Sequence, residues 1–292
     1  MTRSTTVLAL FALAGCSSGT TTSGQPSAPT PKADPNTPPG VPTPTGVIYH
    51  AVKNATYTLV RHDSLSLQLP GGANQQQLID RTAFLAVTLV PDTGGYQATI
   101  VLDSLQAAAG GVPAALDSLV PAWGTKWTAT LSANGELSAL KADRSTTLGD
   151  QVGATLRSLF PELPHGGVRP GMQWSDTTDV AIRADAFDAT ERGITSYRSS
   201  ESDNSKAKKA VKIESNGTFD RKGKGMQFDQ PLEMSGNGTR NAVHYFGDDG
   251  VLISAQGSDT GDMTITVPAV GQTVPVKQTG SYTISAIRPP KG

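Results

Sequence analysis

The chain has 292 residues, a formal net charge of −1, and 37% hydrophobic, 17% charged and 5% aromatic residues. This length allows one large domain or two ordinary ones. A charge near zero gives no field that would hold phosphates, which disfavours a nucleic-acid binder and a polybasic protein of the membrane surface. The single cysteine excludes an internal disulfide and, with four scattered histidines, a thiolate-rich zinc site.

The N-terminus has the parts of a secretory signal peptide. Arg3 precedes a mostly apolar run, Val7–Leu13, which is far shorter than the ~20 residues of a membrane-spanning helix. The next residues, Leu13-Ala14-Gly15-Cys16, resemble the lipobox of bacterial lipoproteins at all four positions. The resemblance implies that residues 1–15 are removed and that Cys16 carries a thioether-linked diacylglycerol, usually with a further acyl chain such as palmitate on its amino group.

The predicted anchor implies a location in the cell envelope. Two or three acyl chains, at ~0.8 kcal/mol per buried methylene, hold a protein durably on a membrane. Ser17 resembles the outer-membrane sorting pattern of lipoproteins, so in a cell with two membranes we expect the outer membrane, facing the periplasm. Residues 16–46 are predicted to be this lipidated cysteine and a disordered tether, because 22 of the 29 residues from Ser17 to Thr45 are Ser, Thr, Pro or Gly.

Residues 47–288 are predicted to form a single β-rich body. Apolar and polar residues alternate, as at Leu65, Leu67 and Leu69, which is typical of strands with one buried face. Turn dipeptides between such runs predict hairpins; they are Gly71-Gly72, Gly94-Gly95, Asn134-Gly135, Asn216-Gly217, Asn237-Gly238 and Asp249-Gly250. About eleven to thirteen strands result, too many to stay flat. The predicted fold class is therefore mainly β: a large curled antiparallel sheet, half-barrel or barrel-like, with one or two helices on its concave side.

Two segments show helical spacing instead. Ser145–Phe160 carries a stripe of apolar residues, begins at a candidate N-cap, Ser145 or Thr146, and is ended by Pro161. Gly111–Val120 predicts a shorter helix that is stopped by a proline.

The body could also be a diverged duplication with halves 47–160 and 174–288. Lys126–Leu140 and Asn241–Ala255 are each a strand, a two-residue turn and a strand, and Gly95–Leu102 aligns with Gly225–Leu232 upstream of them. Any two hairpins look alike at this level, so duplication and chance similarity both stay open.

Two motifs resemble catalytic ones but fail in context. Gly15-Cys16-Ser17-Ser18-Gly19 has the spacing of a hydrolase nucleophile elbow, yet it straddles the predicted cleavage site instead of joining a strand to a helix. Asp-Thr-Gly occurs at Asp92 and Asp259, as in pepsin-like aspartic proteases. In that family an apolar strand precedes each motif and Ser or Thr follows it, and neither site fits. Pro91–Gly94 instead predicts a reverse turn. We therefore expect a protein that is not an enzyme.

The remaining polar residues suggest no metal or cofactor. His50, His62, His165 and His244 share no ligand spacing, so we expect them to face solvent. Several aspartates between positions 248 and 262 could gather around calcium, although turn chemistry explains them as well. A small basic patch at Lys206, Lys208, Lys209 and Lys212 is interpreted as a solvated hairpin end.

The segment Phe160–Trp174 resembles the Pro-x-Leu-Pro…Pro-Gly-x-x-Trp connector of uncharacterised bacterial lipoproteins of β-rich type. The resemblance implies location and fold more than function. At the level of architecture alone, a curled sheet with inner helices is also similar to the half-barrel carriers of lipids and lipoproteins.

Two functions follow as hypotheses. The first is a non-catalytic, membrane-anchored lipoprotein that binds a lipid or other hydrophobic ligand in an apolar concavity. The candidate lining of that cavity is Leu148, Val152, Leu156, Leu159 and Trp174. The second is a structural lipoprotein that presents a surface or sheet edge to another envelope protein. A hydrolase is a lesser alternative. The expected partners are a membrane, through the lipid anchor, and a hydrophobic small molecule or an envelope protein, but no nucleic acid.

Overall fold

The computed structural model describes residues 38–40, 45–69, 71–184, 187–202, 210–227 and 230–288. Twelve strands form a single antiparallel sheet. They are β1 (Val52–Gln68), β2 (Asn74–Asp92), β3 (Gly95–Ala109), β4 (Val112–Pro113), β5 (Lys126–Ser132), β6 (Leu137–Ala142), β7 (Gln173–Ala184), β8 (Phe187–Glu201), β9 (Ala210–Gln227), β10 (Gln230–Gly247), β11 (Leu252–Val267) and β12 (Gln272–Arg288). The prediction of a mainly β fold with eleven to thirteen strands is confirmed.

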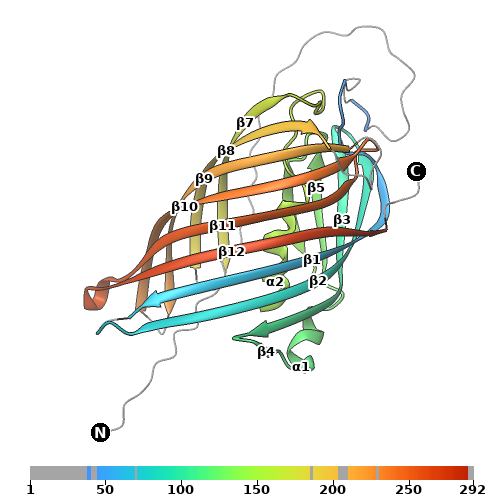
Figure 1. Cartoon of the computed structure of the whole chain (residues 1–292). Helices are drawn as coiled ribbons and strands as arrows, with labels where there is room; N and C mark the ends of the chain where they lie inside the picture. The colour runs from blue at the N-terminus through green and yellow to red at the C-terminus, as the bar shows by residue number, and fades with distance from the viewer. Residues whose placement is uncertain are drawn as a thin grey trace.

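The sheet consists of two antiparallel meanders, from the first six and the last six strands, which join where β1 pairs with β12. The strand order is β6-β5-β3-β2-β1-β12-β11-β10-β9-β8-β7, with β4 paired to β3, so the first and last long strands are neighbours at the centre. β1 pairs with β12 from Thr56–Arg288 to Leu67–Val276. The sheet curls around a concave side, and β6 and β7 form its two edges (Figure 1). Twist accumulated over so many strands produces this curl, as expected.

A helical segment lies on the concave side (Figure 1). It consists of α2 (Thr147–Thr155) and the 3₁₀ turn η2 (Leu156–Leu159). The Thr146 hydroxyl accepts a hydrogen bond from the Gly149 backbone N–H at 3.1 Å, so Thr146 is the N-cap. The helix predicted over Ser145–Phe160 is therefore confirmed, with a tighter last turn.

The second predicted helix is mostly wrong. Within Gly111–Val120, only Leu116–Leu119 is helical (α1), after the short strand β4, and the proline expected to stop it lies inside the 3₁₀ turn η1 (Val120–Ala122). A proline lacks the N–H that later turns would need but tolerates the first turn of a helix. A third 3₁₀ turn, η3 (Pro268–Val270), joins β11 to β12. In the part of the chain that the structure describes, no helix is long and apolar enough to cross a membrane.

Four of the six glycine dipeptides make the predicted hairpin turns, but Asn216-Gly217 and Asn237-Gly238 do not. They lie inside β9 and β10. A Cβ on Gly238 would overlap the Phe219 ring of the neighbouring strand. This glycine therefore makes room for an aromatic ring that lies across the sheet, which a turn motif in the sequence does not reveal.

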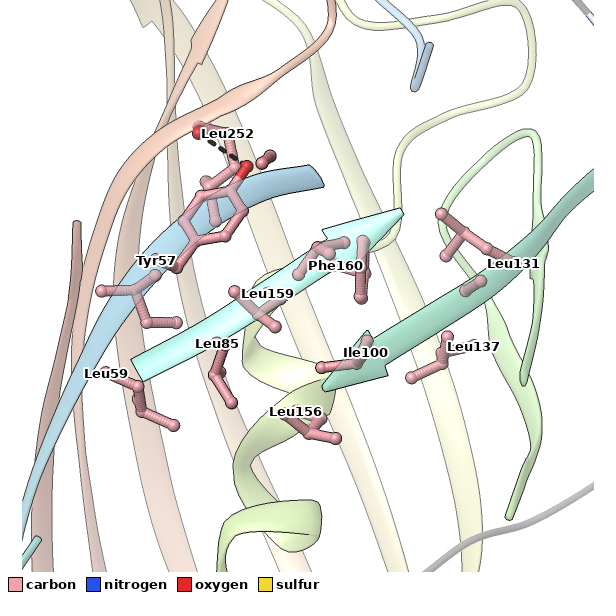
Figure 2. Packing of buried hydrophobic residues seen from close by; sticks show 14 of the residues in the cluster. Tyr57, Leu59, Leu85, Ile100, Leu131, Leu137, Leu156, Leu159, Phe160 and Leu252 are labelled. Carbon is pink, nitrogen blue, oxygen red and sulfur yellow. Dashed lines mark hydrogen bonds between the residues drawn. The ribbon is translucent and has the colours of Figure 1, made fainter. Parts of the chain in front are cut away.

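The main core fills the concave side between the sheet and α2–η2. Leu156, Leu159 and Phe160 are buried against inward-facing residues of β1, β2 and β3, including Leu85 and Ile100 (Figure 2). At the rim of this core, the Tyr57 hydroxyl donates to the Leu252 carbonyl at 3.2 Å, which ties β1 to β11. A second apolar cluster is separate from the first; it contains Leu65, Leu67, Ala189, Met234, Met263, Ile265, Val274 and Val276.

The body begins slightly before the predicted boundary at residue 47. The backbone N–H groups of Thr45 and Gly46 donate to the Gly166 carbonyl, at 3.0 and 3.2 Å. Val47 forms an antiparallel bridge with Val168, in the connector that leads from η2 to β7. A Cβ on Gly46 would lie 2.6 Å from the Val168 carbonyl oxygen, so this close approach requires glycine. Most of the predicted tether, and Cys16, lie outside the described residues.

The strand map bears on the proposed duplication of halves 47–160 and 174–288. Each half contributes six strands of the sheet. However, Gly95–Leu102 lies within the single strand β3, whereas Gly225–Leu232 spans the end of β9 and the start of β10. The upstream part of the sequence alignment is therefore not a structural equivalence.

Candidate binding cavity

A belt of charged side chains crosses the concave face between the two apolar clusters. Along β1 the inward-facing residues are first apolar (Tyr57, Leu59), then charged (Arg61, Asp63), then apolar again. The same change occurs on neighbouring strands. We call the set Arg61, Asp63, Arg81, Glu191, Arg221, Arg240 and Asp259 the charged belt; it comes from β1, β2, β8, β9, β10 and β11.

The first half of the belt is centred on Asp63. This carboxylate forms ion pairs with Arg61, at 2.8 Å, and with Arg81. Arg61 also reaches Asp259 at 3.1 Å, and Arg81 donates through Nη1 to Gln151 of α2 at 2.9 Å. Burial, together with the nearby positive charge of Arg61, lowers the pKa of Arg81 to about 10. The belt thus connects the sheet to the helix that covers it.

The second half of the belt is centred on Glu191. Its two oxygens pair with Arg221, at 2.5 Å, and with Arg240. Burial raises the pKa of Glu191, but the charges of Arg240 and Arg221 outweigh this effect, and the net pKa lies below its usual value. The ring of Phe219 has the guanidinium carbons of Arg240 and Arg221 at 4.7 and 5.4 Å from its centroid. These contacts fix the positions of both guanidinium groups.

Glycines provide the space in which the belt side chains lie. A Cβ on Gly280 would lie 2.6 Å from Nη2 of Arg61 and 2.7 Å from a carboxylate oxygen of Asp259. A Cβ on Gly261 would lie 3.4 Å from the Phe219 ring, which also covers Gly238. Long side chains can therefore lie over the strands only because the facing residues have none.

A cavity of about 350 Å³ lies between the belt and the helical segment. Its walls include all seven belt residues and the side of α2–η2 that carries Gln151, Ala154, Arg157 and Ser158. Of the thirty described residues that line it, 23 have polar or charged side chains, and the seven others are Gly135, Leu137, Ala154, Phe160, Pro161, Phe219 and Ala242. The volume is at the lower end of the ~300–1,000 Å³ of small-molecule sites.

His244 lines this cavity and is 4% exposed, so the expectation that it faces solvent is wrong. Its Nε2 lies 3.1 Å from the Ser158 carbonyl oxygen, and since a carbonyl only accepts, Nε2 carries the proton. Burial lowers the pKa of His244 to about 4. Among the described residues its Nδ1 has no hydrogen-bond partner. The sequence places this histidine on the inward-facing phase of β10, a periodicity that would have revealed its burial.

An acidic pair, Glu162 and Asp176, also lines the cavity. Burial, together with a hydrogen bond to Asp176 and the negative charge of that residue, raises the pKa of Glu162 to about 8. The amide of Asn134 donates to Oε1 of Glu162 at 3.1 Å. Trp174 donates to the Glu162 carbonyl at 3.1 Å and stacks on Tyr197, with ring centroids 5.1 Å apart and an interplanar angle of 6°. Tyr197 lines the cavity, so the stacked ring of Trp174 holds a cavity-lining residue in position.

The residues predicted to line a ligand cavity lie elsewhere. Val152, Leu156 and Leu159 are buried in the main core, and Leu148 and Trp174 are partly buried against it. None of the five is among the residues that line the 350 Å³ cavity. Leu159 borders a much smaller pocket of about 20 Å³ beside Tyr49 and Phe160. The predicted helix thus faces the cavity with its polar side and the core with its apolar side.

The belt was not predicted, although β1 carries a readable signal. Arg61 and Asp63 fall on the same alternating positions as Tyr57, Leu59, Leu65 and Leu67, that is, on the buried phase of the strand. Charged residues in that phase indicate either an interior ion pair or a polar site. The sequence does not show which charges from distant strands meet them.

Other candidate motifs are placed apart. Asp92 precedes the exposed turn between β2 and β3, as the reverse-turn interpretation predicts, whereas Asp259 belongs to the belt. In the basic patch, Lys206, Lys208 and Lys209 lie outside the described residues, and Lys212 pairs with Glu214 at 2.5 Å. Within the described ranges, no group of three or more His, Cys, Asp or Glu residues is arranged to hold a metal ion.

Comparisons with known proteins give no functional guide. No protein-family model matches the chain, and no curated protein matches it. A solved structure, DynF from the dynemicin biosynthesis pathway of Micromonospora chersina, aligns over 91% of this chain and 94% of its own, with 11% sequence identity and a TM-score of 0.23. A likeness at this level carries no conclusion about the present chain.

Proposed function

We propose that this protein is a non-catalytic, lipid-anchored binding protein of the cell envelope that holds a small ligand on the concave side of its sheet. The observation that carries the proposal is the cavity of about 350 Å³ between the charged belt and α2–η2. Apolar side chains pack in the two clusters on either side of the cavity and stabilise the sheet there. The open volume between them is therefore not required for the stability of the fold. The lipobox at Cys16 supports the anchored location.

The chemistry of the walls modifies the ligand expected from the sequence. A site for an acyl chain needs an apolar lining, and such a chain would leave buried polar groups without partners. Here most lining residues are polar, and the apolar surface of the helix is used in the core. We therefore propose a ligand, or the part of a ligand that enters the cavity, with polar groups.

Binding without catalysis fits the partners of the three belt carboxylates and of His244. Asp63, Glu191 and Asp259 are engaged in ion pairs with arginines. Among the described residues, His244 hydrogen-bonds to a backbone carbonyl and to no serine or threonine hydroxyl that it could activate.

A second candidate is an interaction lipoprotein that pairs through a sheet edge. Within the described residues, the edge strand β7 forms ladder hydrogen bonds with β8 alone, over twelve residues. Long unpaired edges are templates for another strand. A dimer or a co-purifying envelope protein that dissociates when proline is introduced into β7, with the cavity empty, would favour this candidate.

Native mass spectrometry of the protein purified from its own membranes tests the binding proposal. We expect a small molecule bound at one per chain. In the variant Ala154→Trp, an indole from α2 occupies part of the cavity, and this molecule should be lost. Thr147→Trp, at an exposed position of the same helix, is the matched control and should retain it. An Ala154→Trp protein that is folded and still carries the molecule would place the ligand elsewhere.

A further inference from the structure

The four arginines of the charged belt are all paired with its three carboxylates, which leaves the belt only a small excess of positive charge. Each of the four belt arginines has a carboxylate partner in Asp63, Asp259 or Glu191. Among the described residues that line the cavity, five arginines face six carboxyl groups, and the raised pKa of Glu162 keeps that carboxyl protonated near pH 7. A charged group on a ligand would meet about as many like charges as opposite charges in the cavity. The cavity therefore does not favour the binding of an ion over that of a neutral ligand.

The walls nevertheless offer many hydrogen-bonding groups. Asn241, Gln278 and Ser215 line the cavity, together with the hydroxyl-bearing rings of Tyr197 and Tyr282. Paired carboxylates and guanidinium groups also keep lone pairs and N–H groups beyond those used in the pair. Arg240 shows this directly, because 39% of its side chain stays exposed while it holds Glu191. A ligand with many hydroxyl groups, each a donor and an acceptor, can satisfy such walls.

Ring surfaces interrupt the polar walls. Tyr197 is fixed by its stack on Trp174, and Phe219 is fixed by the two arginines and by the glycines beneath it. Both rings line the cavity. A rigid aromatic side chain provides apolar contact at little cost in conformational entropy. The cavity therefore presents hydrogen-bonding groups alternating with C–H and ring surfaces, and a sugar presents the same two kinds of surface.

From the paired charges, the hydroxyl and amide lining and the fixed rings, we infer that the cavity binds a neutral, hydroxyl-rich carbohydrate unit of one or two sugar rings. The inference rests on the proposed binding function and names its ligand class. Such a unit could be a free saccharide or the headgroup of a glycolipid, whose acyl chains would remain outside the cavity. The chemistry in the cavity is the same in both cases.

Binding of defined probes to the purified protein tests the inference. The protein is kept in a detergent without a sugar headgroup, and the probes are maltose and chitobiose in solution, diglucosyl-diacylglycerol in phosphatidylcholine vesicles, and palmitate as an apolar comparison. Isothermal titration and tryptophan fluorescence report binding, the latter because Trp174 is stacked on a wall residue. We expect saturable binding of a sugar probe that competes with the other sugar probes and is lost in Ala154→Trp.

A matched pair of variants connects binding to the lining. Gln278→Leu keeps the size of a cavity residue and removes its amide, whereas Gln256→Leu makes the same change at an exposed position on β11. Gln278→Leu should weaken sugar binding about three- to tenfold, the effect of one neutral hydrogen bond, and Gln256→Leu should leave it unchanged. Equal effects of the two variants would overturn the assignment of the sugar to this cavity.

The probes also separate the two possible failures. Binding of the free disaccharides supports a saccharide ligand, and binding of the vesicle glycolipid alone supports a headgroup ligand. Palmitate binding that Ala154→Trp abolishes, with no sugar binding up to millimolar concentration, would overturn the carbohydrate inference and retain the binding function. No binding of any probe, together with no small molecule in the native protein, would overturn both.

Discussion

Leu156→Ala tests whether the helical segment supports the concave side of the sheet. Leu156 is 0% exposed and belongs to the same buried cluster as Leu85 and Ile100 (Figure 2). The change removes about three carbon groups from the core, worth ~0.8 kcal/mol each in transfer free energy, and leaves a cavity that the sheet cannot collapse around. We therefore expect a loss of about 2 to 5 kcal/mol in the free energy of unfolding.

Urea unfolding followed by circular dichroism measures this loss, and a thermal scan should show a midpoint lower by about 5 to 15 °C for a body of this size. Leu116→Ala is the control, because this leucine is 59% exposed on α1 and its loss should change the free energy by less than about 0.5 kcal/mol. Since Leu156 does not line the 350 Å³ cavity, ligand binding by the folded variant should be unchanged. A loss below about 1 kcal/mol, or altered ligand binding, would refute the assignment of Leu156 to the core.

Three further predictions concern the anchor, an acid and a glycine. Cys16→Ala should release the protein from carbonate-washed membranes and leave unprocessed precursor, because it removes the predicted acylation site. The pKa of Glu162 is raised to about 8, so its stabilising protonated form is fully present below about pH 4.5 and is lost as pH rises toward 8. Glu162→Gln should therefore be more stable than the wild type above pH 8, by about 1 kcal/mol after screening of this half-exposed group. Gly250→Ala should lower the thermal midpoint by several degrees, because Gly250 has φ +70° and a Cβ there would overlap the Ile48 carbonyl oxygen.

Each of these has an outcome that contradicts it. Membrane association of Cys16→Ala that survives carbonate washing would refute the lipid anchor. If urea titrations at pH 5 and pH 9 show the same stability difference between the wild type and Glu162→Gln, the carboxyl does not titrate as stated. Gly94→Ala serves as the control for Gly250→Ala, since it also has positive φ, at +76°, but a Cβ there would meet nothing within 4 Å. If the two substitutions lower the thermal midpoint equally, the positive φ alone explains the loss, and the overlap with the Ile48 carbonyl oxygen does not contribute.

Local sequence signals were reliable where one segment decides the outcome. Alternation at Leu65 and Leu67 predicted a strand with one buried face, and Thr146 was a correct candidate for the N-cap of α2. They failed where a distant residue decides. Asn237-Gly238 has the composition of a turn, but both residues lie within β10. A glycine is required at position 238 because a Cβ there would overlap the ring of Phe219. The inward-facing phase of β10 indicates that His244 is buried, but its contact with Ser158 of η2, 86 residues away, appears in no local pattern.

The sequence by itself determined the mainly β class, the number of strands and the apolar stripe of the inner helix, since each depends on periodicities of two and 3.6 residues along one segment. The tertiary structure decided which face of that helix meets the cavity and which charges meet in the belt. Asp63 and Asp259 are 196 residues apart in the chain, yet both contact Arg61, because β1 and β11 each lie beside β12. Strand order and register depend on contacts between residues far apart in the chain. They place charges from six strands beside one another, so that these charges line one polar cavity.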